Sequence, residues 1–231
     1  MRKGKTVTAA WADLEPPAWA SDAAKYPSAG ESDSVVQAAI HASAFTVERR
    51  VVEAARKAKF KLTKAQQRLI PIVAQHQLNA QAEVFAAFYV NLELAVACTT
   101  TQLESTGRMV YGADPASSWM NDGPFGDLWE HEVTEASYKW FGHEVDLGRV
   151  SNGVGLKQLT SRSLQVAADN RGGCWVAEHN AAEGDVLMIE LINQTGSIWH
   201  AFYSYNGSGA AAVNYANNAV AIVSEWRARL A

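Results

Sequence analysis

Cysteine is scarce in this sequence: Cys98 and Cys174 are the only two among 231 residues. Two cysteines exclude the disulfide framework that holds many small secreted domains together. One disulfide bond between the two cysteines is an alternative. Two buried free thiols are the preferred interpretation, because Cys98 lies in an apolar stretch and Cys174 precedes Trp175. Buried thiols are poor nucleophiles, and the sequence also lacks a Gly-x-Ser-x-Gly motif. Nucleophilic catalysis by cysteine or serine therefore has little support.

Long apolar runs are missing as well. The best candidate, residues 84–97, is interrupted by Asn91 and Glu93, which excludes a membrane span there. The basic start at residues 1–5 is not followed by an apolar core of signal-peptide length, so we expect synthesis in the cytoplasm without a signal peptide. The net charge of −4 provides no excess of positive charge, and we expect no nucleic-acid partner.

The overall composition of the chain is typical of a globular protein. Hydrophobic residues make up 48% of the chain and charged residues 19%, which argues against disorder. A chain of this length can bury one full core. Eight tryptophans predict a large aromatic core, a ligand cleft with stacking surfaces, or both.

Three regions follow one another along the chain: a mobile arm over residues 1–33, a basic helical region over 34–78 and a helical domain over 79–231. In the second region, Thr63 is the predicted cap of a helix toward Gln77, and Pro71 should kink or restart that helix. Its basic residues either contact an anionic polymer or membrane surface, or form a solvated helix face. The residues that carry this patch are Arg49, Arg50, Arg56, Lys57 and Lys59.

A long apolar helix is predicted from residue 79 to about 102, buried on nearly all sides, with its end at Gly107. Glu104 lies near that C-terminal end. Burial and the negative end of the helix dipole both disfavour a carboxylate and raise its pKa, which suits a general acid. A solvated glutamate at a helix end is the alternative.

Residues 111–152 have a different character, rich in glycine, tryptophan and acidic residues. Short strands or irregular loops are predicted there, with one helical piece near 130–140, and such an insertion commonly forms a binding segment or lid. Its candidate catalytic carboxylates are Asp114, Asp122, Asp127, Glu130 and Glu132. Further helices are predicted over residues 161–168, 180–193, 199–205 and 210–230, with Gly172-Gly173 ending the first of them.

One stretch of this insertion begins like a zinc-protease helix. In His131-Glu132-Val133-Thr134-Glu135, however, Glu135 stands where the motif requires a second histidine. An exposed charged helix is the preferred interpretation, and we expect no metal and no cofactor.

Three short stretches together resemble the goose-type lysozyme and soluble lytic transglycosylase family. They are Glu104-Ser105-Thr106-Gly107, then residues 151–160 with Gly155-Leu156-Lys157-Gln158, then residues 201–209 with Tyr205-Asn206. Residues 152–215, which include Gly172-Gly173-Cys174-Trp175, are similar to lysin domains of phages that infect actinobacteria. The resemblance covers roughly residues 92–226. It implies a mainly α, lysozyme-like fold with a small irregular or β insertion, and cleavage of the β-1,4 bond between N-acetylmuramic acid and N-acetylglucosamine.

The resemblance also implies roles for individual residues. Glu104 matches the catalytic acid and base, and the substrate-binding positions are Ser105, Gly155, Gln158, Tyr205 and Asn206. Within this set, Gln158 would offer its amide to the sugar and the Tyr205 phenol would help hold the acid. Two departures concern the subsites: Lys157 replaces a methionine and would place a charge near the cleft, and Thr106 and Arg108 replace positions that are often glycine.

Two reaction outcomes and one non-catalytic alternative follow. A lytic transglycosylase needs one carboxylate, whereas an inverting hydrolase needs a second one about 6.5–9.5 Å away, for which Asp114, Asp122 and Asp127 are the candidates. The alternative is a glycan-binding or virion structural module. We expect a monomeric phage endolysin or virion-associated lysin, released by a holin or carried in the particle, whose basic patch contacts an anionic envelope.

Overall fold

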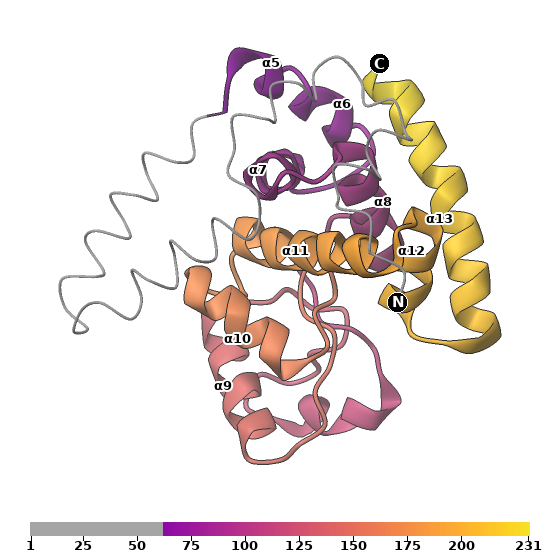
Figure 1. Ribbon diagram of the computed structural model, residues 1–231. Helices are drawn as coiled ribbons and strands as arrows, with labels where there is room; N and C mark the ends of the chain where they lie inside the picture. Colours follow the sequence, from indigo (N-terminus) through magenta and orange to yellow (C-terminus); the bar gives the residue numbers. More distant parts are fainter. Residues whose placement is uncertain (1–61) are drawn as a thin grey trace, which may run out of the picture.

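The computed structural model describes residues 62–231, and this part of the chain is mainly helical, as expected from the sequence (Figure 1). The predicted arm over residues 1–33 and the basic patch from Arg49 to Lys59 lie outside the described residues. The helices are α5 (Lys64–Gln67), α6 (Ile70–Ala74), α7 (Ala80–Val90), α8 (Leu94–Glu104), the 3-10 helix η1 (Pro115–Asp122), α9 (Glu135–Asp146), α10 (Arg162–Arg171), α11 (Ala177–Thr195), α12 (Ile198–Asn206) and α13 (Gly209–Leu230).

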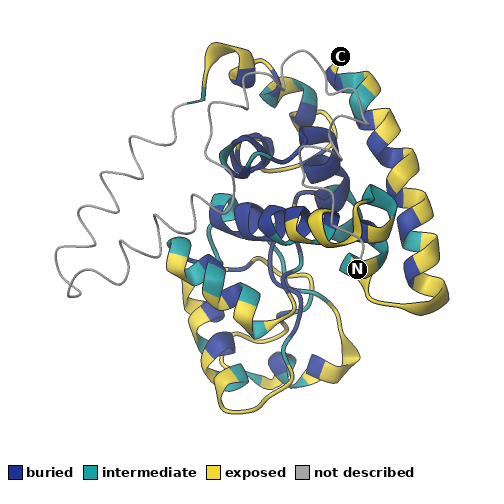
Figure 2. Cartoon of the chain, viewed as in Figure 1, coloured by how far each residue is buried: buried dark blue, intermediate teal, exposed yellow. Residues whose placement is uncertain are grey.

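A large helical body is built around α7 and α8. Helix α7 packs against α6 and α11, while α8 packs against α7 and α13. Both central helices are buried over most of their length, as their dark blue colour in Figure 2 shows. Helix α13 instead alternates buried and exposed residues, with its apolar stripe turned toward the body. The prediction of a buried apolar helix leading to Glu104 is confirmed for α8.

The single long helix predicted from residue 79 to 102 is wrong, because the chain breaks between α7 and α8. Asn91 adopts the left-handed conformation (φ 62°) and caps α7. Asparagine tolerates that conformation better than most residues, so it ends helices as glycine does. Glu93 then begins α8 and is held by two hydrogen bonds from Arg227 of α13, at 2.6 and 2.8 Å.

The short helices α5 and α6 belong to the same body. Thr63 forms the predicted cap, as part of a capping box with Gln66. Pro71 lies at the start of α6, so it restarts the chain as a second helix. Leu69 and Val73 are buried in the main core, and residues 62–78 therefore pack onto the helices that follow them.

A smaller lobe is formed by η1, α9, α10 and the irregular chain between them, below α11 in Figure 1. Within residues 62–231 the β structure consists of isolated bridges that pair Val110 with Glu132, and Tyr111 with Trp129 and Val154. The lobe has its own core, in which Phe141 is fully buried and Trp119 stacks on it with ring centroids 5.9 Å apart. Irregular chain, rather than regular strands, therefore fills the predicted insertion.

Helix α9 begins later than predicted. Thr134 caps it through a capping box with Ser137, so the helix covers residues 135–146 instead of 130–140. Residues 131–133 precede it, and the exposed charged helix expected over the His131-Glu132 stretch is wrong for these residues. The four predicted C-terminal helices are all present as α10 to α13, and Gly172 (φ 133°) ends α10 as expected. Among the described helices, none combines the length and the apolarity needed to cross a membrane.

Candidate active site

Glu104 is the last residue of α8 and faces Tyr215 of α13. The Tyr215 hydroxyl donates a hydrogen bond to Glu104 Oε1 at 2.5 Å. Both side chains are half-buried, and they come from helices that pack directly against each other. A short hydrogen bond to one carboxyl oxygen fixes the orientation of the group and leaves the other oxygen free to donate or accept a proton.

The surroundings of Glu104 raise its pKa above the ordinary value for glutamate. Burial is the largest cause, and it is opposed by the hydrogen bond from Tyr215 and by the positive charge of Lys157. A carboxyl group with a raised pKa keeps its proton into the pH range where a general acid must donate it. The sequence-based alternative of a fully solvated helix-end glutamate does not fit this position.

The turn over residues 154–158 lies directly against the end of α8. Ser105 Oγ donates to the carbonyl oxygen of Leu156 at 2.8 Å, and the Tyr205 hydroxyl donates to that of Lys157 at 2.8 Å. Burial raises the pKa of Tyr205, and the nearby charge of Glu104 raises it further. The structure therefore brings the three stretches singled out in the sequence together at one place.

Tyr205 nevertheless does not hold the acid as the resemblance implied. The Tyr205 hydroxyl donates its hydrogen bond to the Lys157 carbonyl, and it is Tyr215 that donates to Glu104. The sequence-based prediction did not include Tyr215, although the sequence holds a signal for it. Tyr215 lies three residues after Ala212 on the buried stripe of α13, and this stripe continues to Ala219. A hydroxyl-bearing aromatic on an otherwise apolar helix stripe needs a buried partner.

Gln158 and Gly155 shape the turn. The Gln158 amide donates both of its hydrogens to backbone carbonyls, those of Val110 at 3.0 Å and Gly155 at 2.9 Å. The prediction that this amide is offered to a sugar therefore does not fit the geometry. Gly155 has φ +76°, and a Cβ there would lie 2.4 Å from the side chain of Asn180, so the turn requires glycine at this position.

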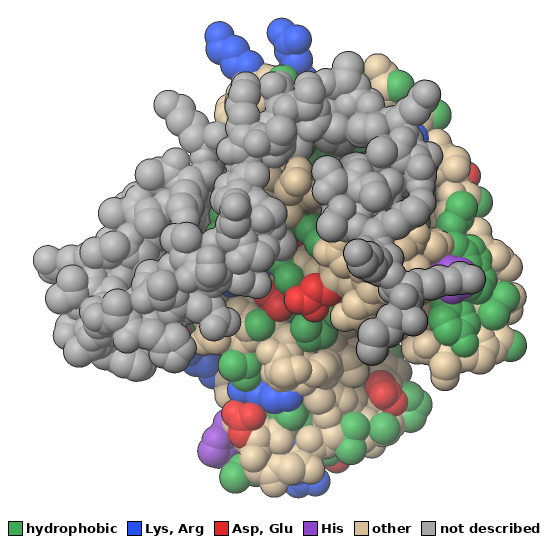
Figure 3. Space-filling model, in the orientation of Figure 1, with side chains coloured by type: hydrophobic (Ala, Val, Ile, Leu, Met, Phe, Trp, Pro, Cys, Tyr) green, Lys and Arg blue, Asp and Glu red, His purple; other side chains and the backbone are tan. Residues whose placement is uncertain are grey.

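The other predicted substrate-binding residues differ in exposure. Ser105 is buried, and its hydroxyl is used by the turn. Asn206 is the exposed last residue of α12, which leaves it accessible to a ligand. On the face drawn in Figure 3, acidic side chains lie near the centre, at the boundary between body and lobe, with hydrophobic side chains around them.

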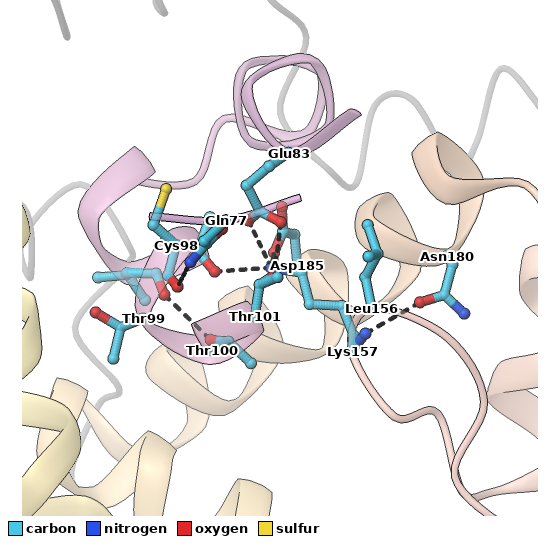
Figure 4. A network of polar contacts seen from close by, with 12 residues as sticks. Gln77, Glu83, Cys98, Thr99, Thr100, Thr101, Leu156, Lys157, Asn180 and Asp185 are labelled. Carbon is cyan, nitrogen blue, oxygen red and sulfur yellow. Dashed lines mark hydrogen bonds and ion pairs between the residues drawn. The ribbon is translucent and has the colours of Figure 1, made fainter. Parts of the chain in front are cut away.

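Lys157 does not place a charge in the cleft, and that prediction is wrong. Its side chain is completely buried, where its ammonium group contacts Glu83 and Asp185 (Figure 4). The backbone of the 154–158 turn faces Glu104, while this side chain points away into the body.

The proposed second carboxylates lie in the lobe and are exposed. Asp114 caps η1 by accepting from the backbone N–H of Ala116, and Asp127 accepts from that of Trp129. Asp122 is the last residue of η1. The causes of the raised pKa of Glu104 are burial, Tyr215 and Lys157, and none of them is one of these acids.

The two thiols of the described residues are not activated for nucleophilic attack. Cys98 and Cys174 are free and buried, as predicted. Burial raises the pKa of both thiols, that of Cys174 to about 12, so neither is a ready nucleophile. Between residues 62 and 231, histidine, cysteine, aspartate and glutamate side chains form no group of three or more that could hold a metal ion.

Comparisons with known proteins add no relative: no family model, no curated protein and no solved structure matches this chain.

Proposed function

We propose that this protein is a peptidoglycan-degrading glycosidase with a lysozyme-like fold, which cleaves the β-1,4 bond between N-acetylmuramic acid and N-acetylglucosamine. The observation that carries the proposal is the position of Glu104. It is a half-buried carboxyl with a raised pKa, held by Tyr215 at the junction of the body and the lobe. A module that only bound glycan would have no need for a protonated acid in that position.

The proposed reaction is that of a lytic transglycosylase. With Tyr215 donating to Oε1, the acidic proton of Glu104 is carried on Oε2 and passes to the glycosidic oxygen as the bond to C1 of the muramic acid breaks. The resulting carboxylate then takes the proton of the muramic acid C6 hydroxyl, whose oxygen bonds to C1 and closes a 1,6-anhydro ring. One carboxyl group is regenerated, and no water, metal or second carboxylate is consumed.

An inverting hydrolysis would use the same acid with a second carboxylate that activates water. Asp114, Asp122 and Asp127 are the acids to test in that case. The setting we propose is a phage endolysin or virion-associated lysin acting on the bacterial wall as a monomer, with peptidoglycan glycan strands as the partner.

Glu104→Gln tests the proposal, because glutamine keeps the shape of the side chain without the proton. Release of soluble fragments from purified peptidoglycan should fall by about 10²–10⁴-fold, while binding to the insoluble wall is retained. Glu225→Gln is the matched control, since Glu225 is exposed and forms an ion pair with Arg229 one turn further along α13. Full activity of Glu104→Gln would contradict the proposal.

Tyr215→Phe sharpens the test. Removing the phenol should lower the rate and raise the pKa of Glu104, because the lost hydrogen bond opposes the effect of burial. The alkaline limb of the pH–rate profile should therefore move to higher pH, since the acid stays protonated longer. An unchanged profile would remove Tyr215 from the site.

A further inference from the structure

The buried ammonium of Lys157 has a complete set of partners. Nζ lies 2.8 Å from Glu83 Oε1, 2.7 Å from Asp185 Oδ1 and 2.8 Å from the carbonyl oxygen of Ala97 (Figure 4). Of the three hydrogens that a lysine ammonium can donate, two bond to Glu83 and the Ala97 carbonyl, while Asp185 contributes an ion pair. The Thr101 hydroxyl adds a 2.5 Å hydrogen bond to Glu83 Oε2. The direction of this side chain is therefore set by contacts on three sides.

These partners come from different helices. Glu83 belongs to α7, Ala97 to α8 and Asp185 to α11. The backbone of Lys157 adds a hydrogen bond from its N–H to Asn180 Oδ1 of α11 at 3.1 Å and one to its carbonyl from Tyr205 of α12. A single residue of the turn thus connects four helices of the body.

Helix α11 leaves room for this side chain. Gly184 lies within α11, where a Cβ would be 2.4 Å from Cβ and 2.5 Å from Cγ of Lys157. Glycine in a helix interior is unfavourable compared with alanine. Its presence where the lysine stem crosses the helix indicates that the packing is adapted to Lys157.

The connection reaches Glu104 through the backbone. The carbonyl oxygen of Leu156, the residue before Lys157, accepts a hydrogen bond from Ser105, which follows Glu104 and is the C-cap residue of α8. A displaced turn would therefore strain or break this hydrogen bond at the end of α8. Lys157 also acts on Glu104 electrostatically, because its positive charge lowers the pKa of Glu104 against the effect of burial. The titratable groups around the ammonium are Glu83 on α7, Cys98 and Glu104 on α8, Asp185 on α11 and Tyr205 on α12.

We propose that Lys157 is a positioning residue for Glu104. Anchored on Glu83, Asp185 and the Ala97 carbonyl, it holds the 154–158 turn against the end of α8 and places a fixed positive charge behind the acid. The catalytic role of Lys157 in this assignment rests on the proposed function, whereas the contacts that Lys157 makes do not depend on that function.

A purely structural triad is the rival account. Replacing a buried ion network with neutral side chains is often tolerated, whereas removing one partner leaves an unpaired buried charge. The informative variant therefore neutralises all three members: Lys157→Met, Glu83→Gln and Asp185→Asn together. The control, Glu93→Gln with Arg227→Met, removes the ion pair that joins α8 to α13, a pair that is not among the causes of the raised pKa of Glu104.

The measurement is a carbon-13 NMR titration of the Glu104 side-chain carboxyl in the full chain, combined with the pH–rate profile on purified peptidoglycan. In the triple variant the pKa of Glu104 should rise by about 0.5–1 unit, and kcat should fall roughly tenfold through lost positioning. The Glu93/Arg227 control should leave the pKa of Glu104 unchanged. A folded triple variant with the wild-type pKa of Glu104 would overturn the proposal.

Lys157→Met with Glu83→Gln keeps the test decisive if the triple variant does not fold, because it removes one positive and one negative charge and leaves Asp185, whose pKa is raised by burial, in place. Loss of the Lys157 charge, which lowers the pKa of Glu104 in the wild type, should raise that pKa. An unchanged pKa would overturn the proposal. The titration needs no turnover: if the wild type releases no fragments, the proposed function fails, while the effect of Lys157 on Glu104 is still measured.

Discussion

The body and the lobe of this protein are held together in different ways. In the body, helices rich in small residues pack closely, and ion pairs join them: Lys157 with Glu83 and Asp185, and Glu93 with Arg227. The lobe relies on aromatic packing around short, irregular segments, with Phe141 at its centre. Glu104 belongs to the body and the 154–158 turn joins the two regions, so the acid is carried by the helices of the body.

The largest effect on the body should come from Gly107→Ala. Gly107 has φ +81°, and a Cβ there would lie 2.3 Å from the carbonyl oxygen of Leu78. The closest atoms are backbone atoms of Leu78, so rotation of a side chain cannot relieve the clash, and the free energy of unfolding should fall by roughly 4–5 kcal/mol. Urea unfolding measures it. Gly126→Ala in the lobe is the control, because Gly126 also has positive φ but nothing within 4 Å; an equal loss there would contradict the steric account.

Phe141→Ala should disrupt the packing of the aromatic core of the lobe. Phe141 is fully buried, with ring centroids 5.5 Å from Tyr111 and 5.9 Å from Trp119. Loss of this ring should lower the free energy of unfolding by roughly 3–4 kcal/mol. Hydrogen exchange should show the loss of protection mainly in α9, with α7 and α8 less affected. Phe125→Ala, at a 43% exposed position, should cost below about 1 kcal/mol; equal exchange throughout both regions would contradict a separately packed lobe.

Asp185 should give the body a pH dependence that the lobe lacks. Burial, with a contribution from Glu83, raises the pKa of Asp185 above its ordinary value against the effect of Lys157. The folded protein therefore keeps a proton on Asp185 to higher pH than the unfolded chain, which releases it near pH 4. Above about pH 4 the folded state binds more protons, so stability falls as pH rises through the folded pKa of Asp185, where the carboxylate forms its ion pair with Lys157.

Asp185→Asn should remove this slope, and thermal unfolding at pH 5 and pH 7 measures it. Asp146→Asn in the lobe is the control: Arg162 lowers the pKa of Asp146, so its contribution is constant above pH 5. Identical slopes for wild type and Asp185→Asn would contradict the assignment.

Thr106→Gly should produce the smallest effect, and in the opposite direction. Thr106 adopts φ +54°, which is unfavourable for a β-branched residue by about 1–2 kcal/mol. Glycine removes that strain but adds conformational freedom to the unfolded chain, so a net gain of about 0.5–1 kcal/mol in the free energy of unfolding is expected by urea titration. Thr160→Gly, at an exposed position without positive φ, should lose stability. A loss at Thr106 would contradict the strain.

The sequence allowed prediction of features that depend on nearby residues. The cap at Thr63, the restart at Pro71 and the end of α10 at Gly172 are all confirmed, because each depends on backbone preferences within a few residues. The sequence does not predict the helix end at Asn91, because asparagine adopts the left-handed conformation only in some contexts.

The site was predictable only in part, for a different reason. Glu104 could be singled out from its position near a helix end, but its partner Tyr215 lies 111 residues further along the chain. Lys157 and Gln158 were assigned to the cleft because a resemblance gives the position of a residue and not the direction of its side chain. Their partners, Glu83 and Val110, are 74 and 48 residues away, and only the folded chain brings them together.

The most direct test of the proposed function is mass spectrometry of the fragments that the protein releases from purified peptidoglycan, with Glu104→Gln measured in parallel. We predict fragments ending in 1,6-anhydro-muramic acid from the wild type and a near absence of fragments from the variant. Ordinary reducing ends would instead indicate hydrolysis and direct the next mutants to Asp114, Asp122 and Asp127. Equal release by wild type and Glu104→Gln, or no release by the wild type, would contradict the assignment of Glu104 as the catalytic acid.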